Sequence, residues 1–108
     1  MTVWVSIRRE ALEDIEHAQM YFAGINADLE NRFRLEIERT VEQLQTFPES
    51  HQKILGDVRR VLLRHFYYAL YYTIQIDAIE IIAVLDTRRD PSRWQSRISA
   101  EPDAGKPI

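Results

Sequence analysis

The spacing of apolar residues changes along the chain, and this change limits the folds open to it. Between residues 9 and 47, apolar side chains recur every three or four positions, as they do on one face of a helix. From residue 58 onward, runs rich in β-branched and aromatic residues indicate strands. Helices followed by most of the strands are typical of an α+β domain.

Two consecutive helices are predicted in the first half of the chain. The first starts near Arg9 and stops at Gly24, and Asn26 can cap the second. The second ends at Phe47, because the residue before Pro48 disfavours the α region. Their apolar stripes are Leu12, Ile15, Ala18 and Phe22, and Leu29, Phe33, Ile37, Val41 and Leu44. The short linker requires the two helices to pack as an antiparallel hairpin.

Strands are predicted on both sides of this hairpin. Residues 2–7 alternate between apolar and other side chains, and three further runs cover residues 58–65, 67–76 and 79–85, the last two joined by a tight turn at Asp77-Ala78. The last run, IEIIAVL, is almost entirely apolar, as expected of a central strand or one covered on both faces. Residues 49–57 are predicted to be a polar connection.

The order β-α-α-β-β-β predicts an α+β fold in which the N-terminal antiparallel helical hairpin packs on a small, mostly antiparallel sheet. We expect the first strand to return and pair with one of the later strands. A short C-terminal helix is predicted from Pro91 to Ile98, with Trp94 docking it on the sheet. Trp4 is also predicted to be a packing residue. Residues 1–98 then form one domain, and residues 99–108 form a polar tail that we expect to be disordered.

Composition limits the class of protein. With 45% hydrophobic residues in 108, the chain can build one modest core. It contains no cysteine, which rules out disulfides and thiolate metal sites. The start, MTVWVSIRRE, has no signal-peptide core, and no apolar run approaches the roughly 18–20 residues of a membrane span. We expect a cytoplasmic protein with no membrane partner.

The segments IRREALEDIEHAQMYFAGINADLENRFRLEIERTVEQLQTFPES, VRRVLLRHFYYALYYTI and IIAVLDTRRDPSRW occur in this order. Together they resemble the RelE/ParE superfamily of bacterial toxin–antitoxin systems, and most closely its ParE-like, or plasmid stabilisation, branch. The resemblance covers about residues 3–97. Its most specific part combines a pattern of Arg64, Phe66, Tyr68, Tyr71 and Tyr72 with a strand that ends in Arg-Arg-Asp-Pro before a tryptophan.

The resemblance implies two helices against a small antiparallel sheet. It also implies a toxin that is encoded beside an antitoxin, whose C-terminal segment wraps the toxin and silences it. Among relatives, ParE-type toxins poison DNA gyrase and RelE-type toxins cut messenger RNA in the ribosomal A site. Either a homodimer or a toxin–antitoxin hetero-oligomer would be compatible with the sequence.

The candidate site residues are mainly arginines. Arg88 and Arg89 suit contacts with phosphate or carboxylate groups, whereas their alternative role is ion pairing with Asp86 and Asp90. Arg60 and Arg64 would share one face of a strand and could join the same patch, or could only keep a charged strand face from aggregating.

Aromatic and histidine residues are weaker candidates. Tyr67 and Tyr71 would share one strand face, while Tyr68 and Tyr72 belong to the face expected in the core. His65 lies near the basic strands, but as a general base it would need an orienting partner. The histidines show no metal-ligand spacing, and no motif implies a cofactor.

The chemical groups that RNA cleavage requires distinguish a nuclease from a toxin that only binds its target. RNA cleavage needs a base, an acid and stabilisation of the phosphorane, which RelE-type nucleases supply with lysines, arginines and often a C-terminal Tyr or His. Lys53 and Lys106 are the only lysines of this chain, and its last residues, DAGKPI, include neither Tyr nor His. It also carries Asp86 where many relatives have a histidine. We therefore expect a binding toxin with no chemistry of its own and with gyrase as its target. The alternatives are a ribosome-dependent endoribonuclease that uses Arg60, Arg64, His65, Arg88 and Arg89, and a degenerate member that only binds antitoxin.

Overall fold

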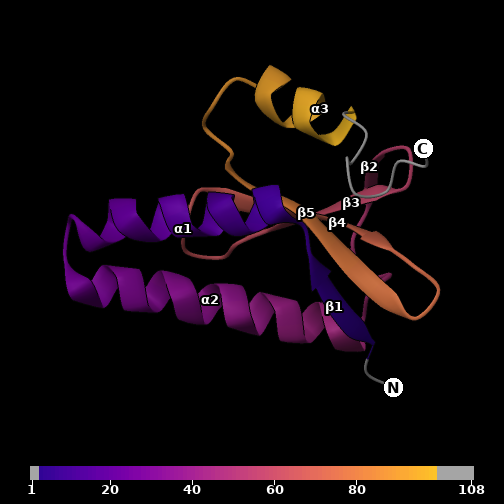
Figure 1. Cartoon of the computed structure of the whole chain (residues 1–108), viewed down its shortest axis with the longest axis horizontal. Coiled ribbons are helices and arrows are strands. Elements are labelled where there is room, and N and C mark those ends of the chain that lie inside the picture. The colour runs from indigo at the N-terminus through magenta and orange to yellow at the C-terminus, as the bar shows by residue number, and fades with distance from the viewer. Residues whose placement is uncertain (1–2, 100–108) are drawn as a thin grey trace.

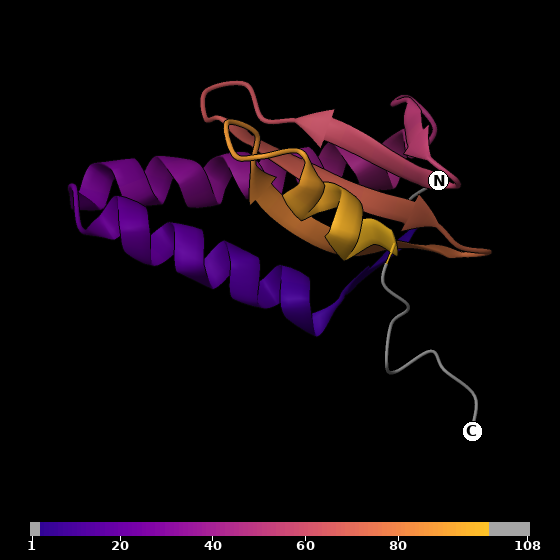
Figure 2. The same cartoon turned by 90° about the horizontal axis from the view of Figure 1, so that it is seen from above.

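The computed structural model describes residues 3–99, which form three helices and a five-stranded sheet (Figure 1). The elements in chain order are β1 (Trp4–Ile7), α1 (Arg9–Ala23), α2 (Ala27–Thr46), β2 (Lys53–Leu55), β3 (Val58–Leu62), β4 (Tyr68–Ile74), β5 (Ala78–Asp86) and α3 (Ser92–Ser99). The antiparallel pair α1 and α2 covers one face of the sheet, and α3 lies on the other face (Figures 1 and 2). The predicted α+β fold is confirmed.

The second helix of the hairpin, α2, begins and ends as predicted. The side chain of Asn26 accepts a hydrogen bond from the N–H of Leu29 at 2.7 Å, and α2 stops before Phe47-Pro48. The predicted stripe of α1 is partly wrong. Leu12 is exposed, and Ala11 is buried in its place, so that the buried face contains Ala11, Ile15, Ala18 and Phe22. Both sets have helical spacing, and the rotation of α1 about its axis decides between them.

The strand order in the sheet is β1-β5-β4-β3-β2. β1 pairs with β5 in parallel, with Val5 opposite Ile79, and the other three pairs are antiparallel. The predicted return of the first strand is therefore confirmed. β5 lies inside the sheet and is packed on both faces, which explains why its sequence is almost entirely apolar.

A β-bulge in β5 changes which of its side chains face the helices. Tyr71 lies opposite Ala83 and Tyr72 opposite Ile81, so Ile82 is an extra residue in β5. Ile79 and Ile81 pack in the core with the helices, and beyond the bulge Val84 does so. Ile82 and Ala83 pack on the α3 side.

The prediction for residues 49–57 is wrong in part, because they contain the short strand β2. Leu55 pairs with Val58 across a two-residue turn in which Gly56 has a φ of 56°. Glycine adopts this left-handed conformation without a steric penalty, so the Gly56-Asp57 pair was a hairpin signal. A strand of three residues is too short to show an alternating pattern.

The two tryptophans differ from each other. Trp94 stacks on Tyr71, with ring centroids 5.8 Å apart, and so docks α3 on the sheet as predicted. Trp4 is 77% exposed, so its predicted packing role is wrong. Trp4 lies opposite Ala78 at the start of β5, whereas α3 packs near Leu85 at the other end of that strand.

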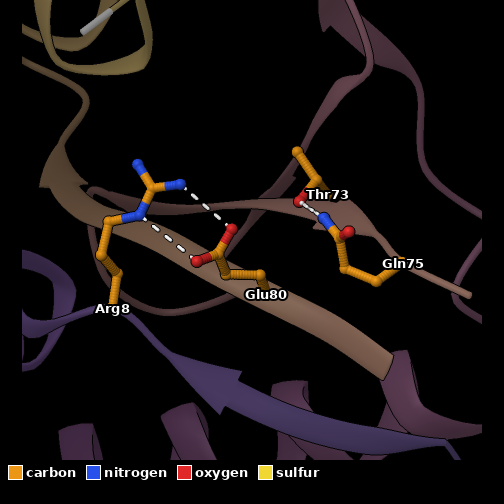
Figure 3. A network of polar contacts seen from close by, with 4 residues as sticks. All are labelled: Arg8, Thr73, Gln75 and Glu80. Atoms are coloured by element: carbon orange, nitrogen blue, oxygen red, sulfur yellow. Dashed lines mark hydrogen bonds and ion pairs between the residues drawn. The ribbon is translucent and has the colours of Figure 1, made fainter. Parts of the chain in front are cut away.

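An ion pair joins the start of α1 to β5 on the face of the sheet opposite to the helical hairpin (Figure 3). Arg8 donates from Nε and Nη2 to the two carboxylate oxygens of Glu80, at 3.4 and 3.0 Å. Its backbone N–H donates to the carbonyl of Ile81 at 2.9 Å. Beside this fork, Thr73 accepts a hydrogen bond from Gln75. Arg8 therefore fixes the position from which α1 leaves the sheet.

The C-terminal helix starts and ends one residue later than predicted, since α3 spans Ser92–Ser99. Residues 100–108, most of the predicted polar tail, lie outside the described residues, and the domain boundary stays a prediction. Among residues 3–99, each helix is too short or too polar to cross a membrane.

Candidate functional site

Arg88 is locked against the end of β5. Its Nε and Nη2 donate to the two oxygens of Asp86 at 3.2 and 3.0 Å, and its backbone N–H donates to Asp86 Oδ1 at 2.9 Å. The guanidinium also lies over the ring of Tyr67, 4.8 Å from its centroid. The hydrogen bond from Arg88 holds the pKa of Asp86 below its ordinary value, despite partial burial. The ion-pairing alternative is therefore observed for Arg88.

Arg89, the next residue, is exposed and differs from Arg88 in its surroundings. Its backbone N–H donates to the carbonyl of Asp86, but within residues 3–99 its guanidinium forms no ion pair. The alternative role of Arg89, an ion pair with Asp90, is not observed within residues 3–99. Asp90 instead accepts the N–H of Ser92 at 3.0 Å, which caps the start of α3. The charge of Arg89 is therefore available to a partner.

The predicted alignment of Arg60 and Arg64 on one strand face is wrong. β3 ends at Leu62, so Arg64 lies in the connection to β4 and is exposed. Arg60 stays on the strand, and its guanidinium lies over the ring of Trp94, 5.8 Å from the centroid. Arg60 is thus engaged by α3 and is not aligned with Arg64 on one strand face.

His65 lies in the same connection and has the orienting partner that the sequence did not reveal. Glu36 on α2 accepts the His65 backbone N–H at 3.0 Å, and its other oxygen lies 2.9 Å from Nδ1. Nε2 is left on an exposed side chain. Burial alone would raise the pKa of Glu36, but the hydrogen bonds from His65 outweigh burial and hold the pKa below its ordinary value of 4.5.

We expect Glu36→Gln to lower the free energy of unfolding by about 1 kcal/mol at neutral pH, because the charge-assisted bonds to His65 are weakened in a partly solvated site. A lowered pKa in the folded state means that the wild type has this stabilisation above about pH 4.5 and loses it as pH falls through the folded-state pKa. Urea unfolding between pH 7 and pH 3 should show the two proteins converging at acid pH. Glu42→Gln, an exposed acid on the same helix, serves as control. A pH-independent difference would contradict this account.

A cleft beside the end of β5 combines the predicted site residues Arg88 and Arg89 with residues that were not predicted as part of a site. It has a volume of about 400 Å³ and is lined by His17, Tyr21, Tyr68, Asp86, Arg88 and Arg89. His17 and Tyr21 come from α1, one helical turn apart, while the others come from the ends of β4 and β5. Tyr68 packs against Phe22 and Phe33 and also reaches the cleft, so its expected core role is only part of its position. The helical spacing of His17 and Tyr21 was the available signal.

A carboxylate joins α1, β5 and α3 beside this cleft. Asp14 Oδ2 accepts the backbone N–H of Val84 at 3.0 Å and the Nη2 of Arg97 at 2.7 Å. Val84 lies beyond the end of the β1–β5 pairing, so Asp14 satisfies a donor that β1 does not reach. Burial raises the pKa of Asp14, and these two hydrogen bonds oppose the rise. Asp14 thereby fastens α3 next to α1 (Figure 1).

Comparison with known proteins identifies the family. A family model described as the ParE toxin of the type II toxin–antitoxin system parDE matches residues 5–91. This chain belongs to the ParE toxin family. The resemblance to the ParE-like branch is therefore confirmed, and the ParE match includes all five predicted site residues: Arg60, Arg64, His65, Arg88 and Arg89. It ends just before α3.

A solved structure supports the same fold. A chain of the chromosomal ParDE TA system from P. aeruginosa aligns with 77% of this chain and with 94% of its own length, at 14% sequence identity and a TM-score of 0.67. Because identity is low, this likeness shows that the fold is shared. No curated protein matches the chain.

Proposed function

We propose that this ParE-family toxin acts by binding DNA gyrase, without chemistry of its own, and that a cognate antitoxin neutralises it. Of the four predicted target-binding arginines, Arg89 and Arg64 are the most available for the target, because Arg60 and Arg88 are engaged within the chain. Arginines held at the centre of an interface often dominate its affinity.

The observation that carries the binding proposal is that the groups a nuclease would need line two neighbouring clefts, which share Tyr68. A nuclease must bring a base, an acid and cations around one phosphate. Here Arg64 and His65 line one cleft, whereas Arg88 and Arg89 line another. The charge of Arg88 is largely cancelled by Asp86. Such an arrangement favours a contact surface over a catalytic centre.

Expression without the antitoxin is expected to arrest growth, and the purified protein is expected to inhibit supercoiling by gyrase and to trap cleavage complexes. Arg89→Ala should weaken this inhibition about tenfold or more, since the truncation removes an available interfacial charge. Arg39→Ala, an exposed arginine on α2, should leave it unchanged. Unaltered supercoiling by the wild-type protein would refute gyrase as the target.

The endoribonuclease remains a second candidate because Glu36 orients His65. A carboxylate that holds Nδ1 leaves Nε2 of a histidine able to exchange a proton. Primer extension on messages after induction distinguishes the two activities. Codon-positioned cuts that disappear in His65→Ala would support the nuclease. Normal growth on overexpression would instead indicate the degenerate, antitoxin-binding member.

The antitoxin is expected to bind at a sheet edge. The apolar stripes of α1 and α2 are buried against the sheet, so the antitoxin cannot dock on them. The outer strands are β1 and β2, and β2 exposes Leu55. An exposed edge strand can accept a strand from a partner. Co-expression with the small protein encoded next door should restore growth.

A further inference from the structure

The cleft between α1 and the ends of β4 and β5 is lined by two arginines and one aspartate. Among residues 3–99, Asp86 is the only carboxylate that lines it, and both oxygens of Asp86 accept hydrogen bonds from Arg88. Arg88 is thus neutralised and is stacked on Tyr67. Arg89 keeps its full charge at the cleft.

An adjoining cleft of about 320 Å³ brings further acids near Arg89, but most are engaged. Asp14 accepts from Val84 and Arg97, and Asp90 accepts from the N–H of Ser92. Of the acids in that cleft, only Glu13 has no such bond within residues 3–99, and Arg93 adds a second exposed cation there. Glu13 and Asp90 keep their negative charge, because a backbone N–H does not neutralise a carboxylate, and Arg93 offsets one of these two charges. The guanidinium of Arg89 forms no ion pair with either acid within residues 3–99.

Two tyrosine rings and an imidazole complete the lining. Tyr21 is 57% exposed and lies one helical turn from His17 on α1. Burial raises the pKa of Tyr68, Asp86 raises it further, and Arg88 and Arg89 lower it. The hydroxyl of Tyr68 therefore lies within electrostatic reach of both arginines.

We propose that this cleft binds the phosphate group of a nucleotide. Arg89 supplies the anchoring charge, because a guanidinium donates two parallel hydrogen bonds to phosphate oxygens. Tyr68 and His17 supply further donors, and the exposed ring of Tyr21 offers a stacking surface to the base. The volume of about 400 Å³ lies at the small end of ligand pockets and suits one nucleotide. This proposal goes beyond gyrase binding and does not depend on it.

The test is isothermal titration of the purified full chain with inorganic phosphate, AMP and an oligothymidylate. We expect saturable binding of AMP and of the oligonucleotide. Arg89→Ala should weaken both about tenfold, as expected when one charge-assisted contact is lost. Tyr21→Ala should weaken AMP binding several-fold and leave phosphate binding unchanged. Arg39→Ala, which lies outside the cleft, is the matched control.

The outcomes separate the sources of the phosphate. Tighter binding of the oligonucleotide than of AMP assigns the cleft to a nucleic-acid strand, and equal binding assigns it to a free nucleotide. The proposal is overturned by an absence of saturable binding at millimolar ligand, or by equal effects of Arg89→Ala and Arg39→Ala. Because gyrase is absent from this titration, such a failure leaves the gyrase proposal standing. If the protein binds nucleotides but does not inhibit gyrase, the gyrase proposal fails and the nucleotide proposal stands.

Discussion

Replacing Phe33 with alanine is expected to lower the free energy of unfolding by about 3–5 kcal/mol, the range found when a buried aromatic ring is removed. Phe33 is fully buried, and its ring centroid lies within 5.0–5.4 Å of those of Phe22, Phe66 and Tyr68. The substitution leaves a cavity where α2 meets the other helix and the start of β4. Urea unfolding monitored by circular dichroism measures the loss.

Leu12→Ala is the matched control, since Leu12 is a large apolar residue of the hairpin that is 46% exposed. It should cost less than about 1 kcal/mol. If Phe33→Ala fails to fold, Phe33→Leu keeps most of the volume and should cost about 1–2 kcal/mol. Similar losses for Leu12→Ala and Phe33→Leu would contradict the observed rotation of α1 and the position of this aromatic cluster.

Replacing Asp14 with alanine should lower the free energy of unfolding by about 2–3 kcal/mol and should loosen α3. The change leaves the N–H of Val84 without its acceptor and the guanidinium of Arg97 without its carboxylate. Arg97→Ala should cost less, because Val84 keeps its partner. Glu16→Ala, an exposed acid on the same helix, should be nearly neutral.

The release of α3 can be observed directly. The chain has two tryptophans, so in a Trp4→Phe background Trp94 is the only one left. Undocking of Trp94 from Tyr71 should shift its emission to longer wavelength in Asp14→Ala, with no such shift in Glu16→Ala. An unchanged spectrum would show that the stack of Trp94 on Tyr71 holds α3 without Asp14.

The ion pairs also explain why the sequence could not distinguish Arg88 from Arg89. The pattern Asp86-Thr-Arg88-Arg89 makes the two arginines look equivalent. In the structure both arginines line the same cleft, but Arg88 is paired with Asp86, whereas Arg89 forms no ion pair within residues 3–99. A local pattern cannot show which of two neighbouring arginines takes the nearby carboxylate.

The residues that complete the cleft belong to elements far apart in the chain. His17 and Tyr21 are on α1, and they meet Arg89 only because α1 packs across β5. The bond between Glu36 and His65 likewise joins residues 29 positions apart. Helical spacing indicates which residues share a face, but it does not indicate which distant element packs against that face, so neither contact could be predicted from the sequence.

Local and periodic signals were sufficient for most of the fold. Three such features are found as predicted: the cap at Asn26, the stop before Pro48 and the apolar run of β5. The first two depend only on neighbouring backbone, and the third depends only on burial. The family was also readable from the order of these segments. Tertiary packing alone decided the rotation of α1, the extra residue Ile82 in β5 and the partners of the arginines. Each of these depends on how separate elements are placed relative to one another. The hydrophobic pattern indicates which face of an element is buried, but not where that element lies on its neighbour.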